Sequence, residues 1–149
     1  TTKAGVLVGA TYYSGTALYW YGNSSGTNCT VYAYIRGNDG YRTAGAYNLT
    51  PGQYHHLVLV NDYTNSSINL YANGVLNGTY AGPTQDYNPG LTPSAGNIGI
   101  NKAQVDGGGT QVYSNLPCLV PITKIYNRSL SSAEVTQNFK KYQTRFGLA

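Results

Sequence analysis

The sequence predicts an all-β protein, a two-sheet antiparallel sandwich closed by one short C-terminal helix. Short runs rich in β-branched and aromatic residues recur along the chain, with turn-forming residues about every eight to twelve positions. Asn73-Gly74 lies between two of these runs and is the strongest short-range hairpin signal. Helical spacing appears at the end of the chain, where Val135, Phe139 and Tyr142 form one apolar stripe.

The first half of the chain is predicted to form antiparallel strands joined by short turns. Asn38-Asp39-Gly40 provides the chemistry of a hairpin turn. The predicted strands cover residues 6–13, 17–21, 30–36 and 41–48.

The middle of the chain has a clearer pattern. Residues 54–62 predict a strand that is apolar on both faces at its centre, which is typical of a strand interior to a sandwich. The Asn73-Gly74 hairpin joins residues 68–72 to residues 75–80. After it we expect an irregular stretch at 81–95, a short strand at 96–100 and a long loop at 101–118.

The last thirty residues predict an apolar strand over 119–126, a tight turn and the helix. Ser131 is the expected N-cap, and Glu134 three positions later completes a capping box. Leu130 and Val135 can form the hydrophobic staple across this cap.

The composition favours binding through hydrogen bonds and aromatic rings rather than through charge. Only 9% of the 149 residues are charged, against roughly 25% in an average soluble domain. Polarity comes from Asn, Ser, Thr, Gly and 16 Tyr. Such surfaces suit secreted, cell-surface or virion proteins, so we expect an extracellular or virion-surface location. No apolar run approaches a membrane span, so no membrane partner is predicted.

The net charge is +4, and the excess of basic residues lies partly near the C-terminus. A nucleic-acid patch is one interpretation of this cluster. The favoured interpretation is that Lys140 and Lys141 lie in the last helical turn, where cations complement the helix dipole. No nucleic-acid partner is therefore predicted. The basic residues concerned are Lys124, Arg128, Lys140, Lys141 and Arg145.

Cys29 and Cys118 have no metal-type spacing. A disulfide and two buried thiols both remain open. The chain contains no Met, so we expect a processed product or a piece of something longer.

Three segments together resemble the concanavalin A-like lectin/glucanase superfamily and its laminin-G-like jelly-roll domains. They are residues 54–62, with Tyr54 in the place of a Trp in relatives, residues 68–76, and residues 122–131 followed by Glu134-Val135. The resemblance covers roughly residues 1–149. It implies one domain with a concanavalin A-like jelly-roll sandwich.

Relatives usually carry additional N-terminal strands before the region where this chain starts. We therefore expect preceding residues, or a neighbouring subunit, to complete the sheets. The resemblance implies that the 1–149 domain is part of a larger polypeptide or assembly.

Some relatives are glycoside hydrolases, which need two carboxylates flanking the scissile bond. The chain has five acidic residues, and no two lie within ten positions of each other. Capping explains Glu134, and a hairpin turn explains Asp39. The resemblance therefore does not carry over the catalytic residues, and we predict no enzyme activity. His55 and His56 are adjacent on a predicted strand and face opposite sides, so they cannot share one metal.

Relatives often hold calcium at a sandwich edge through Asp, Asn and backbone oxygens. By this resemblance Asp62 and Asp106 are the candidate metal ligands. Calcium needs several oxygen ligands, and the chain has few carboxylates. No cofactor is predicted, and calcium stays open.

Sugar binding is the favoured ligand hypothesis, because tyrosines supply aromatic platforms and asparagines supply hydrogen bonds. Trp20 alternates with Tyr19 and Tyr21, so it faces the opposite side, and a core role is the alternative for it. The candidate residues are Tyr87, Tyr113, Asn101, Asp106 and Trp20.

The sequence thus predicts a non-catalytic carbohydrate-recognition or adhesion module of an extracellular or virion surface protein. The alternative is a structural decoration or appendage module that binds neighbouring subunits and has no sugar ligand. The expected partners are accordingly glycans or neighbouring protein subunits.

Overall fold

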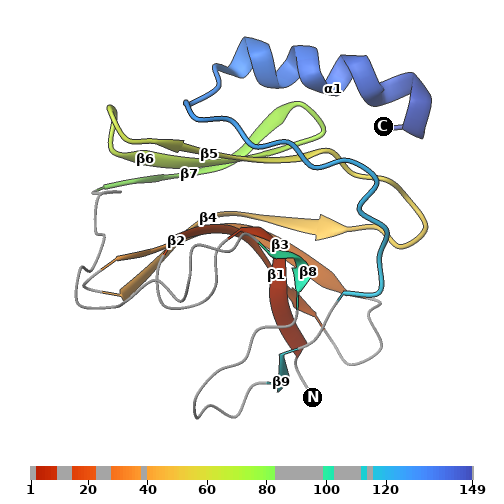
Figure 1. Cartoon of the computed structure of the whole chain (residues 1–149), viewed down its shortest axis with the longest axis horizontal. Coiled ribbons are helices and arrows are strands. Elements are labelled where there is room, and N and C mark those ends of the chain that lie inside the picture. Colours follow the sequence, from red (N-terminus) through yellow and green to blue (C-terminus); the bar gives the residue numbers. More distant parts are fainter. Residues whose placement is uncertain are drawn as a thin grey trace.

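The fold is that of a computed structural model, which describes residues 3–9, 15–22, 28–37, 40–82, 99–102, 112–113 and 116–148. The predicted β-rich body with one terminal helix is confirmed (Figure 1). No helix in these ranges is long and apolar enough to cross a membrane. The elements are β1 (Lys3–Gly9), β2 (Gly15–Gly22), β3 (Cys29–Gly37), β4 (Gly40–Leu49), β5 (Leu57–Asp62), β6 (Ser67–Ala72), β7 (Val75–Ala81), β8 (Gly99–Lys102), β9 (Val112–Tyr113) and α1 (Ser132–Phe146).

The larger sheet has the strand order β4-β3-β2-β1-β8, and β9 also pairs with β1. The pairs along this order are antiparallel, whereas β9 runs parallel to β1. Gly37 lies opposite Gly40, which supports the predicted hairpin between β3 and β4. Its two turn residues, 38 and 39, lie outside the described residues.

The smaller sheet has the order β5-β6-β7, and the predicted hairpin joins its last two strands. Asn73 and Gly74 have φ angles of 48° and 78°. Both are positive, as a two-residue type I′ turn requires. The side chain of Asn73 also accepts a hydrogen bond of 3.0 Å from the backbone N–H of His56. The turn therefore holds the segment that leads into β5.

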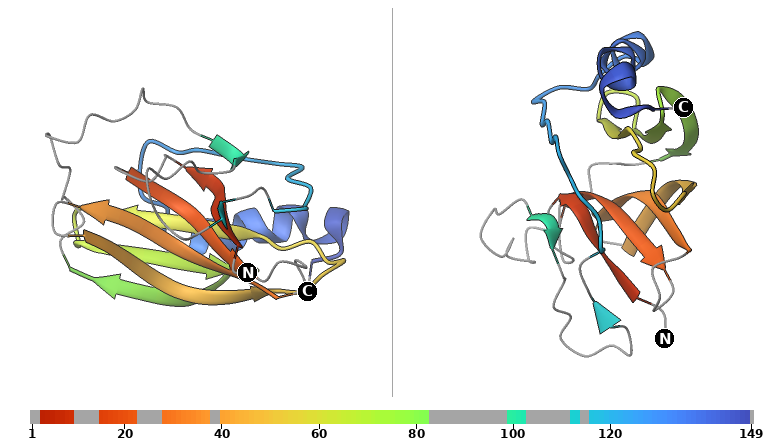
Figure 2. Two further views of the ribbon diagram at one scale, coloured as in Figure 1. Left: turned by 90° about the horizontal axis from the view of Figure 1, so that it is seen from below. Right: turned by 90° about the vertical axis from the view of Figure 1, so that its right-hand side faces the viewer.

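The smaller sheet is the middle of three layers, with the larger sheet on one face and α1 on the other (Figures 1 and 2). Leu57 and Leu59 pack into the clusters shared with the larger sheet. Val58 and Val60 pack into the cluster that contains Val135 of the helix. This explains why the β5 sequence is apolar on both faces. The expected interior position is wrong, because β5 forms an edge of its sheet and its two faces are covered by other layers.

The helix begins and ends at well-formed caps. The Ser131 side chain accepts from the Glu134 N–H, and the Glu134 carboxylate accepts from the Ser131 N–H at 2.9 Å, so the predicted capping box is confirmed. The helix ends at Gly147, whose left-handed φ of 58° closes the last turn. Because it continues to Phe146, Lys140 and Lys141 precede the last turn, and their predicted position is wrong.

The strand predicted over residues 54–62 starts three residues late, at Leu57. Residues 54–56 are held by hydrogen bonds to neighbouring turns and do not pair with another strand. The N–H of Thr50 donates to His55 Nε2 at 3.1 Å, and the N–H of Asn73 donates to the His56 carbonyl at 2.8 Å. The prediction failed because these residues have strand-like composition while neighbouring turns use their hydrogen-bonding groups.

The apolar strand predicted over residues 119–126 is not formed. No backbone–backbone hydrogen bond joins residues 119–127 to another described residue. In both views this segment passes along the β5 side of the middle layer on its way to α1 (Figures 1 and 2). The far edge of β1 is already paired with β8 and β9, so that edge is not open to this segment.

Candidate functional site: an aromatic face of the larger sheet

Four tyrosines gather on the face of the larger sheet that points away from the middle layer. They alternate along β2 and β3 with Trp20 and Val31, which belong to an inner core cluster. The Tyr19 ring stacks on Tyr34 with centroids 5.5 Å apart. The Tyr21 ring meets Tyr19 at 4.9 Å and Tyr32 at 5.8 Å, edge to face in both cases. Tyr19, Tyr21, Tyr32 and Tyr34 together form the tyrosine face.

The four side chains of the tyrosine face differ in how much of their surface is exposed. Tyr19 and Tyr34 are buried, with 3% and 9% of their surface exposed. Tyr21 and Tyr32 are half-buried, so parts of their rings reach the surface. The inner pair contacts the outer pair through its rings, so the four side chains form one aromatic platform.

Strand pairing brings two of the predicted site residues to this sheet. Asn101 lies in β8 and Tyr113 in β9, and both strands lie against β1. Tyr113 is in register with Ala4, and Ala4 is opposite Tyr21. The two residues were expected in a loop, and the structure instead places them on short strands. Nothing local in the sequence predicts these pairings, because they join residues about one hundred positions apart.

The same row ends in polar groups on the other side of Tyr21. Thr30 is opposite Tyr21, and Asn48 is opposite Thr30. The Thr30 hydroxyl donates to Asn48 Oδ1 at 2.7 Å. Phenol, hydroxyl and amide groups therefore follow one another across the sheet, and this combination can stack on a sugar ring and hydrogen-bond its hydroxyls.

The remaining predicted site residues fall elsewhere. Trp20 is 1% exposed and belongs to the core, as its alternation with the tyrosines allows. It therefore leaves the candidate sugar-binding set, because its ring is not open to a ligand. Tyr87 and Asp106 lie outside the described residues.

The two carboxylates in the described part of the chain serve local structure. Asp62 accepts from the Asn65 N–H at 3.0 Å and from its amide nitrogen at 2.8 Å, and this side-chain hydrogen bond is the main cause that lowers the Asp62 pKa. Arg128 donates to both Glu134 oxygens, at 3.0 Å and 2.6 Å, which with the Ser131 contacts lowers the Glu134 pKa to about 2.

Potential metal ligands do not cluster within the same described ranges. These ranges contain no group of three or more His, Cys, Asp or Glu that could hold a metal ion. The other predicted ligand, Asp106, is outside them, so a calcium site at Asp62 and Asp106 stays a prediction.

The two histidines lie in different surroundings, whereas the two cysteines lie near each other. His55 Nδ1 lies 3.0 Å from the Tyr47 hydroxyl, whereas the His56 ring lies against Phe139 with centroids 5.9 Å apart. Burial lowers the His56 pKa, and the charge of Lys124 lowers it further. Cys29 and Cys118 are not joined by a disulfide, and the alternative of two buried thiols holds for Cys29 but is wrong for Cys118, which is exposed. Burial raises the pKa of both thiols, and the nearby Cys29 adds to the effect on Cys118.

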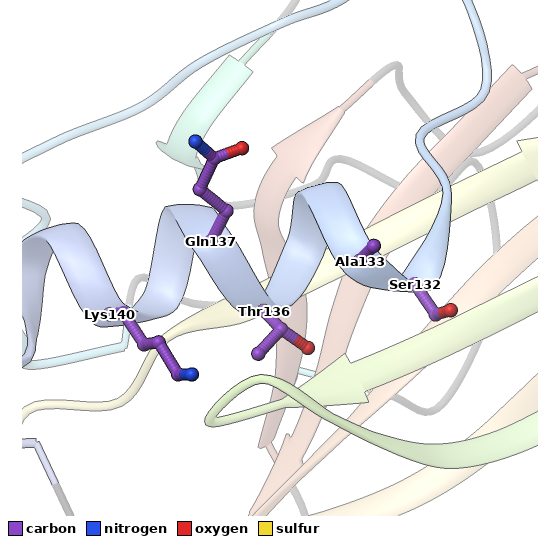
Figure 3. A pocket seen from close by; sticks show the side chains of 5 residues that line it. All are labelled: Ser132, Ala133, Thr136, Gln137 and Lys140. Carbon is purple, nitrogen blue, oxygen red and sulfur yellow. The ribbon is translucent and has the colours of Figure 1, made fainter.

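A shallow open groove on the surface of α1 was not foreseen. Ser132, Thr136 and Lys140 point to one side of the helix, and Gln137 points to the other (Figure 3). The Thr136 hydroxyl donates to the Gly74 carbonyl at 3.2 Å, which ties the groove to the β6–β7 turn. Ser132, Thr136 and Lys140 are four positions apart in the sequence, and this spacing was a signal that could have indicated the groove.

These features define a β-sandwich of the lectin type, with an aromatic sheet face and without paired carboxylates among its described residues. The family model described as the concanavalin A-like lectin/glucanases superfamily matches residues 1–136. The chain belongs to this family, which confirms the resemblance carried by the three sequence segments.

Two further comparisons were made. No curated protein matches the chain. Among solved structures, residues 221–444 of an S-layer domain-containing protein from Clostridium thermocellum ATCC 27405 match with 22% identity and a TM-score of 0.46. The match covers 85% of this chain and 57% of that one, so the chain spans little more than half of that structure.

Proposed function

We propose that the chain is a non-catalytic carbohydrate-recognition or adhesion module of an extracellular or virion surface protein. The tyrosine face carries this proposal, since it offers aromatic rings flanked by a row of hydroxyl and amide groups. Membership in a family of lectins and glucanases supports a glycan as the ligand. Tyr113 and Asn101 lie on strands at the adjoining edge of the sheet and extend the proposed site, and Tyr87 and Asp106 are further candidates.

The roles of the described carboxylates support the non-catalytic part of the proposal. A glycosidase places two carboxyl groups on either side of the scissile bond. Asp62 is engaged in a turn, and Glu134 is engaged in a helix cap. Neither lies on the tyrosine face, which belongs to β2 and β3.

A glycan array tests the proposal. We expect saturable binding of the intact chain to one class of glycan, and at least tenfold weaker binding for Tyr32→Ala and Tyr113→Ala. The matched control is Tyr63→Ala, because Tyr63 is 60% exposed and lies in the turn after β5. Absence of saturable binding across the array, or equal binding by all three variants, would contradict glycan recognition.

A second candidate function is supported by the apolar segment before the helix. Leu119, Ile122 and Ile125 are 79%, 37% and 63% exposed, and the backbone of this segment has no partner among the described residues. The segment follows the outer side of β5, which is an edge strand. An edge strand beside an extended apolar segment is a place where another strand can pair. We therefore propose, as the alternative, a structural module whose sheet is completed by a neighbouring subunit or by further chain.

Light scattering coupled to size exclusion separates the two candidates. The structural role predicts concentration-dependent oligomers that Ile125→Lys dissociates. Val75→Lys is the control, since Val75 is 69% exposed but lies on β7, at the opposite edge of the same sheet. A monomer at all concentrations, together with glycan binding, would leave only the recognition role.

A further inference from the structure

The excess of basic over acidic residues falls in the last part of the sequence. Residues 116–148 carry five of the nine basic residues and one of the five acidic residues, a net charge of +4. The rest of the chain carries four of each, so these residues account for the whole net charge of +4. In number, the excess of basic over acidic residues therefore belongs to the part of the sequence that contains α1 and the segment before it.

Four exposed cations lie on the C-terminal half of α1 and on the preceding segment. The Nζ atoms of Lys124 and Lys141 lie 5.0 Å and 6.0 Å from the centroid of the Tyr142 ring, so this ring joins the segment to the helix. The Arg145 guanidinium lies 5.3 Å from the Phe146 ring. The cationic surface consists of Lys124, Lys140, Lys141 and Arg145.

No described carboxylate neutralises the cationic surface. Glu134 is bound to Arg128 at the first turn of the helix, and Asp62 is bound to Asn65 in a turn. Lys141 and Arg145 are four positions apart on the helix, a spacing at which like charges destabilise it. Such an arrangement favours binding of anions from outside.

The helix dipole does not explain these cations. Its effect falls off within the last turn, and the helix runs on to Phe146. Arg145 is in that last turn, whereas Lys140 and Lys141 are not. The helix dipole, which the sequence favoured as the explanation, therefore does not account for Lys140 and Lys141.

The groove on α1 continues the cationic surface with neutral polar groups. Lys140 belongs to both, and Ser132 and Thr136 precede it on the same side of the helix (Figure 3). From Ser132 to Arg145 the helix advances by about 20 Å. Over this length the hydroxyls come first and the cations follow, and Lys140 is the residue that the groove and the cationic surface share.

We propose that the cationic surface binds an acidic polysaccharide that lies along α1, with its acidic groups on the cations and its hydroxyls on the groove. Cations at one end and neutral hydroxyls at the other match such a polymer better than they match a nucleic acid, whose binding sites contact many successive phosphates. The rings of Tyr142 and Phe146 are half-buried and contact Lys124, Lys141 and Arg145, so they support the cations of this surface. The surface is separate from the tyrosine face, and the inference goes beyond the function proposed above.

Affinity electrophoresis of the intact chain in native gels tests the proposal. We expect retardation by polygalacturonate or dextran sulfate that weakens as salt is raised, and none by uncharged dextran. The double variant Lys140→Gln/Lys141→Gln should bind the acidic polymer at least tenfold more weakly. The relative response to the carboxylated and the sulfated polymer identifies which acidic group is preferred.

The matched control is Asn69→Asp/Asn77→Asp, which lowers the net charge by the same two units elsewhere. Both amide oxygens accept hydrogen bonds, from the Thr79 hydroxyl and from the Ala46 N–H, and a carboxylate can accept them too. Retention of binding by the control and loss by the lysine variant would support the site. Equal loss in both, equal retardation by uncharged dextran, or tighter binding to an oligonucleotide or to phosphatidylglycerol vesicles would overturn it.

Circular dichroism melts of both variants ensure that a loss of binding is not a loss of folding. The Tyr32→Ala variant separates this surface from the tyrosine face, because polygalacturonate binding should survive it. A failed glycan array with intact helix-dependent polymer binding would refute glycan recognition by the tyrosine face and leave this inference standing.

Discussion

Gly74 in the β6–β7 turn lies directly against Phe139 of the helix. A Cβ atom built on Gly74 would lie 2.9 Å from Cδ1, 3.0 Å from Cγ and 3.1 Å from Cβ of Phe139. These atoms are near the root of the side chain, so the ring cannot swing away without a shift of α1. The contact couples the turn chemistry of one layer to the packing of the next.

Gly74→Ala should therefore destabilise the protein for two reasons. A left-handed alanine costs about 1 kcal/mol, and overpacking against Phe139 adds about 1–3 kcal/mol. Urea unfolding measures the sum. Gly52→Ala is the control, because Gly52 has a φ of 79° but an added Cβ there would meet no atom within 4 Å, so it should show the backbone cost alone. Equal losses at the two sites would show that α1 yields to the added methyl group.

The Ser131 cap should contribute measurably to stability. Ser131→Ala removes the acceptor of the Glu134 N–H and should cost about 1 kcal/mol, which lowers Tm by about 2–4 °C in a domain of this size. Thermal unfolding followed by circular dichroism checks this. Ser132→Ala is the control, since Ser132 is the first helical residue and does not cap. Equal Tm values for the two variants would show that the Ser131 cap does not contribute to stability.

Acid should also destabilise the first turn of α1. The Glu134 pKa is lowered to about 2 by Arg128 and Ser131, from 4.5 in the unfolded chain. The folded state therefore binds this proton less tightly, so the contribution is complete above pH 4.5 and is lost as pH falls toward 2. We expect Glu134→Gln to flatten this part of the Tm-against-pH curve. An unchanged curve would mean that other carboxylates govern acid unfolding.

His56 should impose a second pH dependence at milder acidity. Its pKa is lowered by burial and then by Lys124, so the folded state disfavours the protonated ring. Stability from this residue is present above the ordinary value of 6.5 and declines as pH falls below it. NMR titration should show the lowered His56 pKa, and Lys124→Gln should raise it. An unchanged His56 pKa in the Lys124→Gln variant would contradict the proximity of the two groups.

Trp20 is the single tryptophan and reports on the core. Trp20→Ala should cost about 3–5 kcal/mol, and Trp20→Phe less, because its buried indole N–H has no hydrogen-bond partner among the described residues. Unfolding followed by fluorescence in the native chain, and by circular dichroism in the variants, measures this. Tyr63→Ala should stay within about 0.5 kcal/mol of the native chain. A mild effect of Trp20→Ala would contradict the core role of this ring.

Sequence patterns identified the features that depend on a few neighbouring residues. The Asn73-Gly74 turn follows from the backbone conformations that these two residues tolerate. The Ser131 cap follows from hydrogen bonds over three positions. The separation of Trp20 from Tyr19 and Tyr21 follows from the alternation of a strand.

Tertiary structure alone decided which elements meet. The pairing of β8 and β9 with β1 brought Asn101 and Tyr113 to the tyrosine-bearing sheet, and residues 119–126 formed no strand although their composition is strand-like. The continuation of α1 to Phe146 left Lys140 and Lys141 unexplained by the dipole. Strand propensity makes a segment extended, but pairing also needs an open edge, and which edges are open depends on the path of the entire chain.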